Sequence, residues 1–204
     1  MVHMIPPSSF RVIPLVADVG IPMIVVSLPG MIALLLPVVV IEALFIFKRT
    51  SLPTLRVFKA TALANVASTL IGVPLAWCAS LLCEAVIAFG LVGLSKVAPE
   101  LNEWNSPAAK AAGTVISAAW IGDGPTWTVP LAALTLLVPS FFASVWIERK
   151  IMRWSLLATT AGLPQGEEIS DRVLRSLVRD ANLLSYAFLA AVCGAWLMWG
   201  VIHP

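Results

Sequence analysis

The chain has 204 residues, of which 59% are hydrophobic and only 12% are charged, and its mean hydropathy is +0.94. A water-soluble core of this size cannot bury so much apolar surface, so we expect an all-α integral membrane protein whose solvent is lipid. The net charge of +2 is small, and the basic residues lie beside apolar runs, where anionic headgroups are the nearest partner. These features argue against nucleic-acid binding.

The first apolar run is too long for one membrane span. Residues 12–47 contain no Lys or Arg, whereas roughly 20 residues suffice to cross a hydrocarbon core of about 30 Å. Pro22 and the pair Pro29-Gly30 predict a break, because proline removes a backbone donor and clashes with the preceding turn. We therefore expect a first span over 28–47, preceded by a re-entrant or interfacial segment over 12–27, with an extra span as the alternative.

The middle of the chain predicts one span followed by an interfacial segment. The second span, residues 57–82, begins just after a basic loop and contains one proline, which membrane helices tolerate. In residues 84–126, charges and prolines divide the apolar pieces into lengths too short to span. We expect this segment to lie along the outer face with Trp104 and Trp120 at headgroup depth, where they contact lipid or a partner. Re-entrant or additional spans over 85–121 are the alternatives.

The C-terminal part predicts two more spans, residues 127–147 and 181–202. Between them, residues 166–180 place apolar side chains on one helical face and charged side chains opposite. This pattern is typical of an amphipathic helix that lies on the cytoplasmic membrane surface. Its candidate residues for binding anionic lipid or a partner are Arg172, Arg175 and Arg179.

The distribution of positive charge predicts the orientation of the spans. Ten of the thirteen Lys and Arg residues lie within residues 48–59 and 148–180. Lys and Arg that flank membrane spans are retained on the cytoplasmic side. We therefore expect both loops in the cytoplasm, both termini on the other side, and one membrane domain over residues 1–204.

The two halves of the chain share an order of polar features, which predicts an internal repeat. Both halves proceed from an Asp beside a Gly/Pro pair to Ile-Glu, then to a basic loop, and then to Ala-Asn and a Ser. We expect two tandem hairpins, residues 12–94 and 108–202, related by an axis along the membrane normal. The matched residues are Asp18 with Asp123, Glu42 with Glu148, Asn65 with Asn182, and Ser68 with Ser185, at offsets of 105, 106, 117 and 117 residues.

The repeated Asn and Ser residues are candidates for substrate binding. Asn65 and Ser68 share one helical face, and Asn182 and Ser185 repeat that geometry in the last span. In one interpretation the two faces line a polar path between the repeats. In the other they join helices by hydrogen bonds, a common role of such residues in membranes.

Glu42 is the most deeply placed acidic candidate. It lies six residues inside Lys48, which corresponds to about 9 Å of helix. A carboxylate at that depth is costly unless it is protonated or paired, so it is a candidate substrate-binding residue. A structural ion pair with Arg56 or Lys59 is the alternative.

Glu148 is the counterpart of Glu42 in the second half and belongs to the same candidate set. Arg149 and Lys150 follow it directly. We expect Glu148 to form an interfacial ion pair with them, because exposed pairs of this kind are common.

The remaining chemistry-bearing residues do not predict an enzyme. Asp18 and Asp123 are about 36 Å of helix away from the glutamates and are expected to cap helices rather than act as an intramembrane protease pair. No nucleophile, nucleotide or zinc motif is present, and the two histidines stand at opposite ends. We expect no metal and no cofactor.

The leading hypothesis is passage of a small solute or ion through a helical bundle, as a homo-oligomer or with other membrane subunits. The alternative is an accessory or scaffold subunit of a larger membrane complex.

Overall fold

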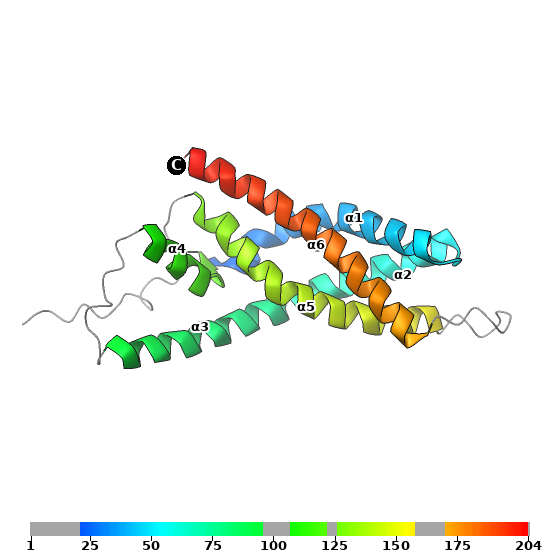
Figure 1. The fold of residues 1–204 in the computed structure, drawn as a ribbon, viewed down its shortest axis with the longest axis horizontal. Coiled ribbons are helices and arrows are strands. Elements are labelled where there is room, and N and C mark those ends of the chain that lie inside the picture. Colours follow the sequence, from blue (N-terminus) through cyan, green and yellow to red (C-terminus); the bar gives the residue numbers. More distant parts are fainter. Residues whose placement is uncertain (1–20, 96–106, 122–125, 158–169, 204) are drawn as a thin grey trace, which may run out of the picture.

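The computed structural model describes residues 21–95, 107–121, 126–157 and 170–203. Within these ranges the chain is mostly helical, with short turns and one pair of two-residue strands, which run antiparallel. Figure 1 shows the elements. They are β1 (Ile21–Pro22), α1 (Met23–Arg49), α2 (Thr54–Ala67), the π-helix η1 (Ser68–Gly72), α3 (Val73–Ser95), α4 (Pro107–Ile116), β2 (Trp120–Ile121), α5 (Thr128–Leu157) and α6 (Asp171–Ile202).

Four helical stretches are long and apolar enough to cross a membrane: Pro29–Arg49, Thr54–Ile87, Thr128–Leu156 and Asp171–Ile202. Their outer faces carry large apolar side chains that are more than half exposed, including Leu36, Leu70 and Phe142. An apolar surface of this extent is typical of contact with lipid. The helical fold class and the number of candidate spans are therefore confirmed.

The four spanning helices form a ring. Helix α1 contacts α2 and α6, and α5 contacts the same two neighbours, so each hairpin is packed both internally and against the other hairpin. Helices η1 and α3 continue α2 in the same direction, and α3 then leaves the ring on the α4 side (Figure 1). The ring is consequently most complete in the half of the bundle that contains α2.

An apolar core fills the ring beside the α1–α2 turn. It contains small residues at the helix contacts, among them Ala60, Ala64 and Ala181, which permit close approach of the backbones. Larger side chains fill the remaining volume. The buried members are Ile46, Leu52, Val57, Ala60, Ala64, Met152, Leu156, Leu174, Val178 and Ala181.

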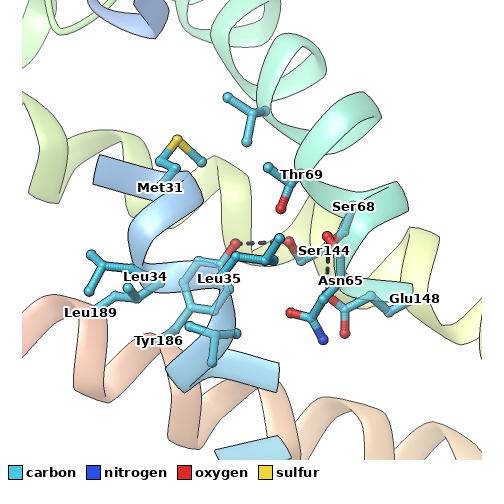
Figure 2. A pocket seen from close by; sticks show the side chains of 12 residues that line it. Met31, Leu34, Leu35, Asn65, Ser68, Thr69, Ser144, Glu148, Tyr186 and Leu189 are labelled. Atoms are coloured by element: carbon cyan, nitrogen blue, oxygen red, sulfur yellow. Dashed lines mark hydrogen bonds between the residues drawn. The ribbon is translucent and has the colours of Figure 1, made fainter. Parts of the chain in front are cut away.

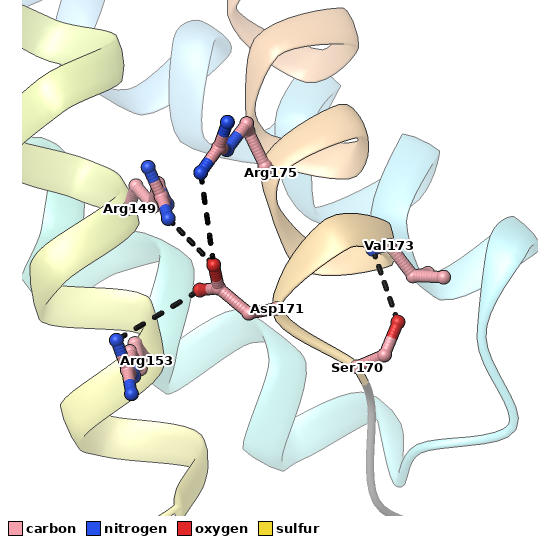
Figure 3. Close-up of polar contacts among 6 residues, drawn as sticks. All are labelled: Arg149, Arg153, Ser170, Asp171, Val173 and Arg175. Carbon is pink, nitrogen blue, oxygen red and sulfur yellow. Dashed lines mark hydrogen bonds and ion pairs between the residues drawn. The ribbon is translucent and has the colours of Figure 1, made fainter.

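Charged residues at the same end of the bundle fix the start of α6 against α5 (Figure 3). The carboxylate of Asp171 accepts a hydrogen bond from Arg149 at 2.6 Å and lies 3.8 Å from Arg175 and 3.9 Å from Arg153. Ser170 caps the helix, because its hydroxyl accepts the backbone N–H three residues later at 3.3 Å. A carboxylate in the first turn also complements the helix dipole.

The opposite end is joined by hydrogen bonds and aromatic contacts. The indole nitrogen of Trp77 donates to the carbonyl of Ala119 at 2.8 Å, and its ring meets that of Trp120 edge to face. The hydroxyl of Thr126 donates to the carbonyl of Gly200 at 3.0 Å. These contacts connect α3, β2, α5 and α6 outside the ring.

The first candidate span, Pro29–Arg49, agrees closely with the predicted span 28–47, but two helices extend beyond the predicted boundaries. Helix α1 passes through Pro29 and Pro37 without a break, because membrane helices tolerate proline where local adjustments and neighbouring groups satisfy the freed carbonyl. Helix α3 continues to Ser95, and the candidate span that contains its first part ends at Ile87, beyond the predicted end at residue 82. This stretch is apolar and contains no proline. The part of the segment 12–27 that precedes residue 21 lies outside the described residues.

The predicted surface helix is not separate from the last span. Helix α6 runs unbroken from Asp171 to Ile202. Its apolar face, with Leu174, Leu177 and Val178, is buried in the ring, so it meets other helices instead of lipid. Residues 166–169 and Trp104 lie outside the described part of the chain.

Candidate functional site

The six polar candidates from the two halves of the sequence meet at the centre of the ring. Each is buried, with at most 4% of its surface exposed. They come from all four helices of the ring: Glu42 from α1, Asn65 and Ser68 from α2 and η1, Glu148 from α5, and Asn182 and Ser185 from α6. We call these six residues the polar layer.

Glu42 is bonded to both hairpins. Its Oε2 accepts a hydrogen bond from the amide nitrogen of Asn65 at 2.6 Å, within the first hairpin. Its Oε1 accepts one from the hydroxyl of Ser185 at 2.6 Å, from the second hairpin. The carboxyl group therefore links α1 to α2 and to α6.

Glu148 makes the equivalent pair of hydrogen bonds, with the roles of the two hairpins reversed. Its Oε2 accepts from the amide nitrogen of Asn182 at 2.7 Å, and its Oε1 accepts from the hydroxyl of Ser68 at 2.8 Å. Each glutamate is thus bonded to the asparagine of its own hairpin and to the serine of the other. This exchange makes the polar layer one connected network.

The helical spacing of Asn and Ser sets the geometry of these donors. Asn65 uses its second amide hydrogen on the carbonyl of Thr61, and Asn182 uses its own on the carbonyl of Val178, both at 3.1 Å. Because each amide nitrogen faces two acceptors, the orientation of each amide is fixed. Each serine lies one turn after its asparagine, so both donors point at the ring centre.

No basic side chain reaches Glu42 within the described residues. Arg56 donates to the carbonyl of Leu156 at 2.8 Å, and Lys59 is exposed. The predicted ion pair of Glu42 with Arg56 or Lys59 is therefore wrong. Its two carboxylate oxygens accept hydrogen bonds from Asn65 and Ser185 instead.

The predicted interfacial ion pair of Glu148 is also wrong. Arg149 bonds Asp171, and the ammonium of Lys150 lies 3.8 Å from the ring centre of Trp146. Successive residues of a helix are rotated by about 100°. Glu148 therefore points into the ring while the two cations that follow it point outward.

A small cavity adjoins the polar layer on the side away from the basic loops (Figure 2). It has a volume of about 60 Å³, which is room for a few water molecules at about 10–15 Å³ each. On its wall the hydroxyls of Ser144 and Tyr186 are hydrogen-bonded at 2.8 Å. The other polar residues that line it are Asn65, Ser68, Thr69 and Glu148.

A second, smaller gap lies between the polar layer and the apolar core. Its polar lining is Glu42, Thr61, Glu148 and Asn182, and the space holds no water-sized volume. Glu148 borders both this gap and the cavity. We call the second space the carboxyl gap.

Three residues near the site were missed by sequence reasoning. Thr61 lies one turn before Asn65 on the same face, and Ser144 lies one turn before Glu148, so helical spacing from the known candidates could have found both. Tyr186 directly follows Ser185 and is the only tyrosine of the chain. Asp18 and Asp123 lie outside the described residues.

A helical bundle with four candidate membrane spans around a buried polar layer is compatible with a multi-pass membrane protein. No protein-family model, curated protein or solved structure matches the chain.

Proposed function

We propose that this protein is a non-enzymatic membrane protein that passes a small ion through its helical bundle, with the polar layer as the ion site. The observation that carries the proposal is the pair of buried glutamates, Glu42 and Glu148, bonded across two hairpins inside the ring of candidate spans. Ionisable residues inside a membrane span are costly and are functional candidates by default.

The size of the cavity favours an ion over a larger solute. Pockets for organic ligands usually measure about 300–1,000 Å³, whereas the cavity beside the polar layer has about 60 Å³. A bare or partly hydrated ion fits this volume. The carboxyl gap has no room even for a water molecule, so it offers no space for a larger solute.

The π-helix η1 supports a functional site at this level. It begins at Ser68, directly after the turn that carries Asn65. Single π-helical turns inside α-helices occur frequently at functional sites. In the matching part of α6 the helix is regular, so the two halves differ where the cavity opens.

We further propose that residues 12–94 and 108–202 are tandem repeats with an axis along the membrane normal. An axis of this kind would exchange the two glutamates and their bonds. The buried faces of α2 with η1 and of α6 support it, since their residues match at an offset of 117. The matched pairs are Val57 with Leu174, Ala60 with Leu177, Thr61 with Val178, Ala64 with Ala181, Asn65 with Asn182, and Ser68 with Ser185.

The orientation is proposed from charge: loops 48–59 and 148–180 face the cytoplasm, and both termini face the other side. The α1–α2 turn and the start of α6 lie at one end of the bundle, which supports this (Figure 1). Arg172, Arg175 and Arg179 are exposed there, where anionic headgroups would contact them.

The experiment is ion flux into liposomes that contain the purified protein. We expect Glu42→Gln and Asn65→Ala to abolish flux driven by a pH gradient or a membrane potential, while circular dichroism and gel filtration stay unchanged. Glu84→Gln is the matched control, because it neutralises a glutamate of α3 outside the polar layer. Unchanged flux in both polar-layer variants would remove these residues from any mechanism.

One observation favours the alternative, an accessory subunit of a larger complex. The part of α3 beyond the ring is widely exposed, with Leu82 at 70%, Val86 at 72% and Phe89 at 81%. In the same stretch Glu84 has a buried carboxylate oxygen without a hydrogen-bond partner among the described residues. A polar partner helix would satisfy it. Purification from the native membrane in mild detergent separates the two functions: stoichiometric foreign subunits support the accessory role, and a lone homo-oligomer supports ion passage.

A further inference from the structure

Two oxygen atoms beside the glutamates lack a hydrogen-bond partner within the described residues. They are Oγ1 of Thr61, whose residue is 1% exposed, and Oδ1 of Asn182, whose residue is fully buried. The amide of Asn182 cannot turn to improve this, because its nitrogen already donates to Glu148 and to the carbonyl of Val178. Buried polar atoms are nearly always satisfied, so these two need a partner.

Both unpartnered oxygens border the carboxyl gap, together with the two glutamates. The gap therefore gathers two carboxyl groups, a hydroxyl and an amide oxygen. Hard cations prefer a set of oxygen ligands of this kind.

The charge of the glutamate pair also requires a positive partner. Two buried carboxylates side by side do not both stay ionised without a counter-charge. The facing side chains supply none within the described residues: Arg56 bonds a carbonyl, Lys59 is exposed, and the Tyr186 hydroxyl is shared with Ser144. Neutrality is reached with two protons, or with one proton and one monovalent cation.

The lack of room for water in the gap argues against strongly hydrated cations. Mg²⁺ keeps several waters in an octahedral shell and Ca²⁺ takes six to eight oxygens, but the gap has no room for water. A bare ion smaller than a water molecule meets this limit. Glu148, which borders both spaces, connects the gap to the cavity.

We propose that the carboxyl gap binds one monovalent cation of the size of sodium, which displaces one proton from the glutamate pair. The proposal rests on the proposed ion passage and names the ion class of that site. Glu42 and Glu148 supply the charge, while Thr61 and Asn182 supply the neutral oxygen ligands. Charge balances, because one cation enters as one proton leaves to water through the cavity.

The test uses the purified full chain in detergent with a weak buffer. NaCl is titrated against choline chloride at constant ionic strength, and the melting temperature and the protons released to an indicator dye are measured. We expect a saturable rise of the melting temperature with sodium, a smaller rise with potassium, and release of about one proton per protein at saturation. The double variant Glu42→Gln/Glu148→Gln should lose both responses, because it leaves no carboxylate in the gap to balance the charge of the cation.

Thr61→Val provides the variant that isolates one ligand. Its counterpart at the matched position of α6 is Val178, so valine is accommodated at this level of the ring. We expect the sodium midpoint to rise about tenfold or more, as for loss of a group that supports a metal site. Thr54→Val, at an exposed position at the start of α2, is the control and should leave the midpoint unchanged.

Several results would overturn the site. They are absence of any sodium effect and of proton release in folded protein, an equal response to choline, or a larger response to calcium or magnesium. Liposome flux separates this inference from the proposed function. Sodium binding without ion flux would support the sodium site and contradict ion passage. Proton flux without sodium binding would support ion passage and contradict the sodium site.

Discussion

At the scale of single residues, each serine of the polar layer donates its hydrogen bond to the glutamate of the other hairpin. Ser68 of the first hairpin bonds Glu148 of the second, and Ser185 of the second bonds Glu42 of the first. In the hydrocarbon region of a membrane, few other groups are present to replace such bonds. The polar layer therefore fixes the two hairpins relative to each other as well as forming the candidate site.

A double-mutant cycle tests the hydrogen bond that Ser185 makes to Glu42 of the other hairpin. Glu42→Ala and Ser185→Ala remove the two partners of one bond, and we expect a coupling energy of about 0.6 kcal/mol and at most about 1.7 kcal/mol, the average and the maximum found between membrane helices. Glu42→Ala with Ser68→Ala is the control and should be closer to additive, because Ser68 bonds the other glutamate. The measurement is the free energy of unfolding in bicelles. Equal coupling in both cycles would contradict the exchanged pattern.

Sequence reasoning identified all six members of the polar layer but assigned the wrong partners to its glutamates. Repeated polar residues in apolar helices predicted that Asn65 and Asn182 belong together. The partners of Glu148 depend on its angle around α5, which adjacency to Arg149 does not reveal. The unpartnered oxygen of Asn182 depends on which hydrogens its amide has already used, and only side-chain geometry shows this.

At the scale of the elements, helix α6 is held at its far end by close backbone contact. A Cβ atom added at Gly200 would lie 3.2 Å from the backbone nitrogen of Trp127 and 3.3 Å from the carbonyl carbon of Thr126. Backbone atoms yield less readily than the end of a flexible side chain. This contact and the bond from Thr126 to the carbonyl of Gly200 hold the end of α6 beside the start of α5.

The matched pair Gly200→Ala and Gly194→Ala tests this contact. We expect Gly200→Ala to destabilise the protein by about 1–3 kcal/mol through overpacking. Gly194 has nothing within 4 Å of an added Cβ, so Gly194→Ala should be neutral or stabilising by up to about 1 kcal/mol, the helix-propensity gain. Unfolding in bicelles measures both. A Gly200→Ala variant as stable as Gly194→Ala would show that the backbone of residues 126–127 can shift to accommodate the added methyl group.

The lengths of the helices were harder to predict than their number. The apolar face with Leu174, Leu177 and Val178 has the same spacing whether it lies on lipid or in a protein core, so the sequence pattern did not distinguish a surface helix from an extension of α6. Pro29 was read as a break because its effect in water is strong. In a membrane helix the same residue is tolerated.

At the scale of the whole molecule, the fold class and the number of candidate spans followed from hydropathy alone, but the order of helices around the ring did not. Lipid-facing and helix-facing surfaces are both apolar, so periodicity carries little information about neighbours. The bonds from Ser68 to Glu148 and from Ser185 to Glu42 determine that order, because they require α2 beside α5 and α6 beside α1.

The last prediction concerns the orientation of the whole bundle. Single cysteines at Ser51, Arg172 and His203, all exposed positions, are introduced after the native Cys78, Cys83 and Cys193 are replaced by alanine. Because Lys and Arg beside spans are retained in the cytoplasm, we expect a membrane-impermeant maleimide to label Ser51→Cys and Arg172→Cys only from the cytoplasmic side. His203→Cys should be labelled only from the opposite side. Each variant is labelled again after detergent permeabilisation as the control for reactivity. Labelling of Ser51→Cys and Arg172→Cys from opposite sides would contradict both the orientation and the parallel repeat, since the two connectors would no longer share one face of the membrane.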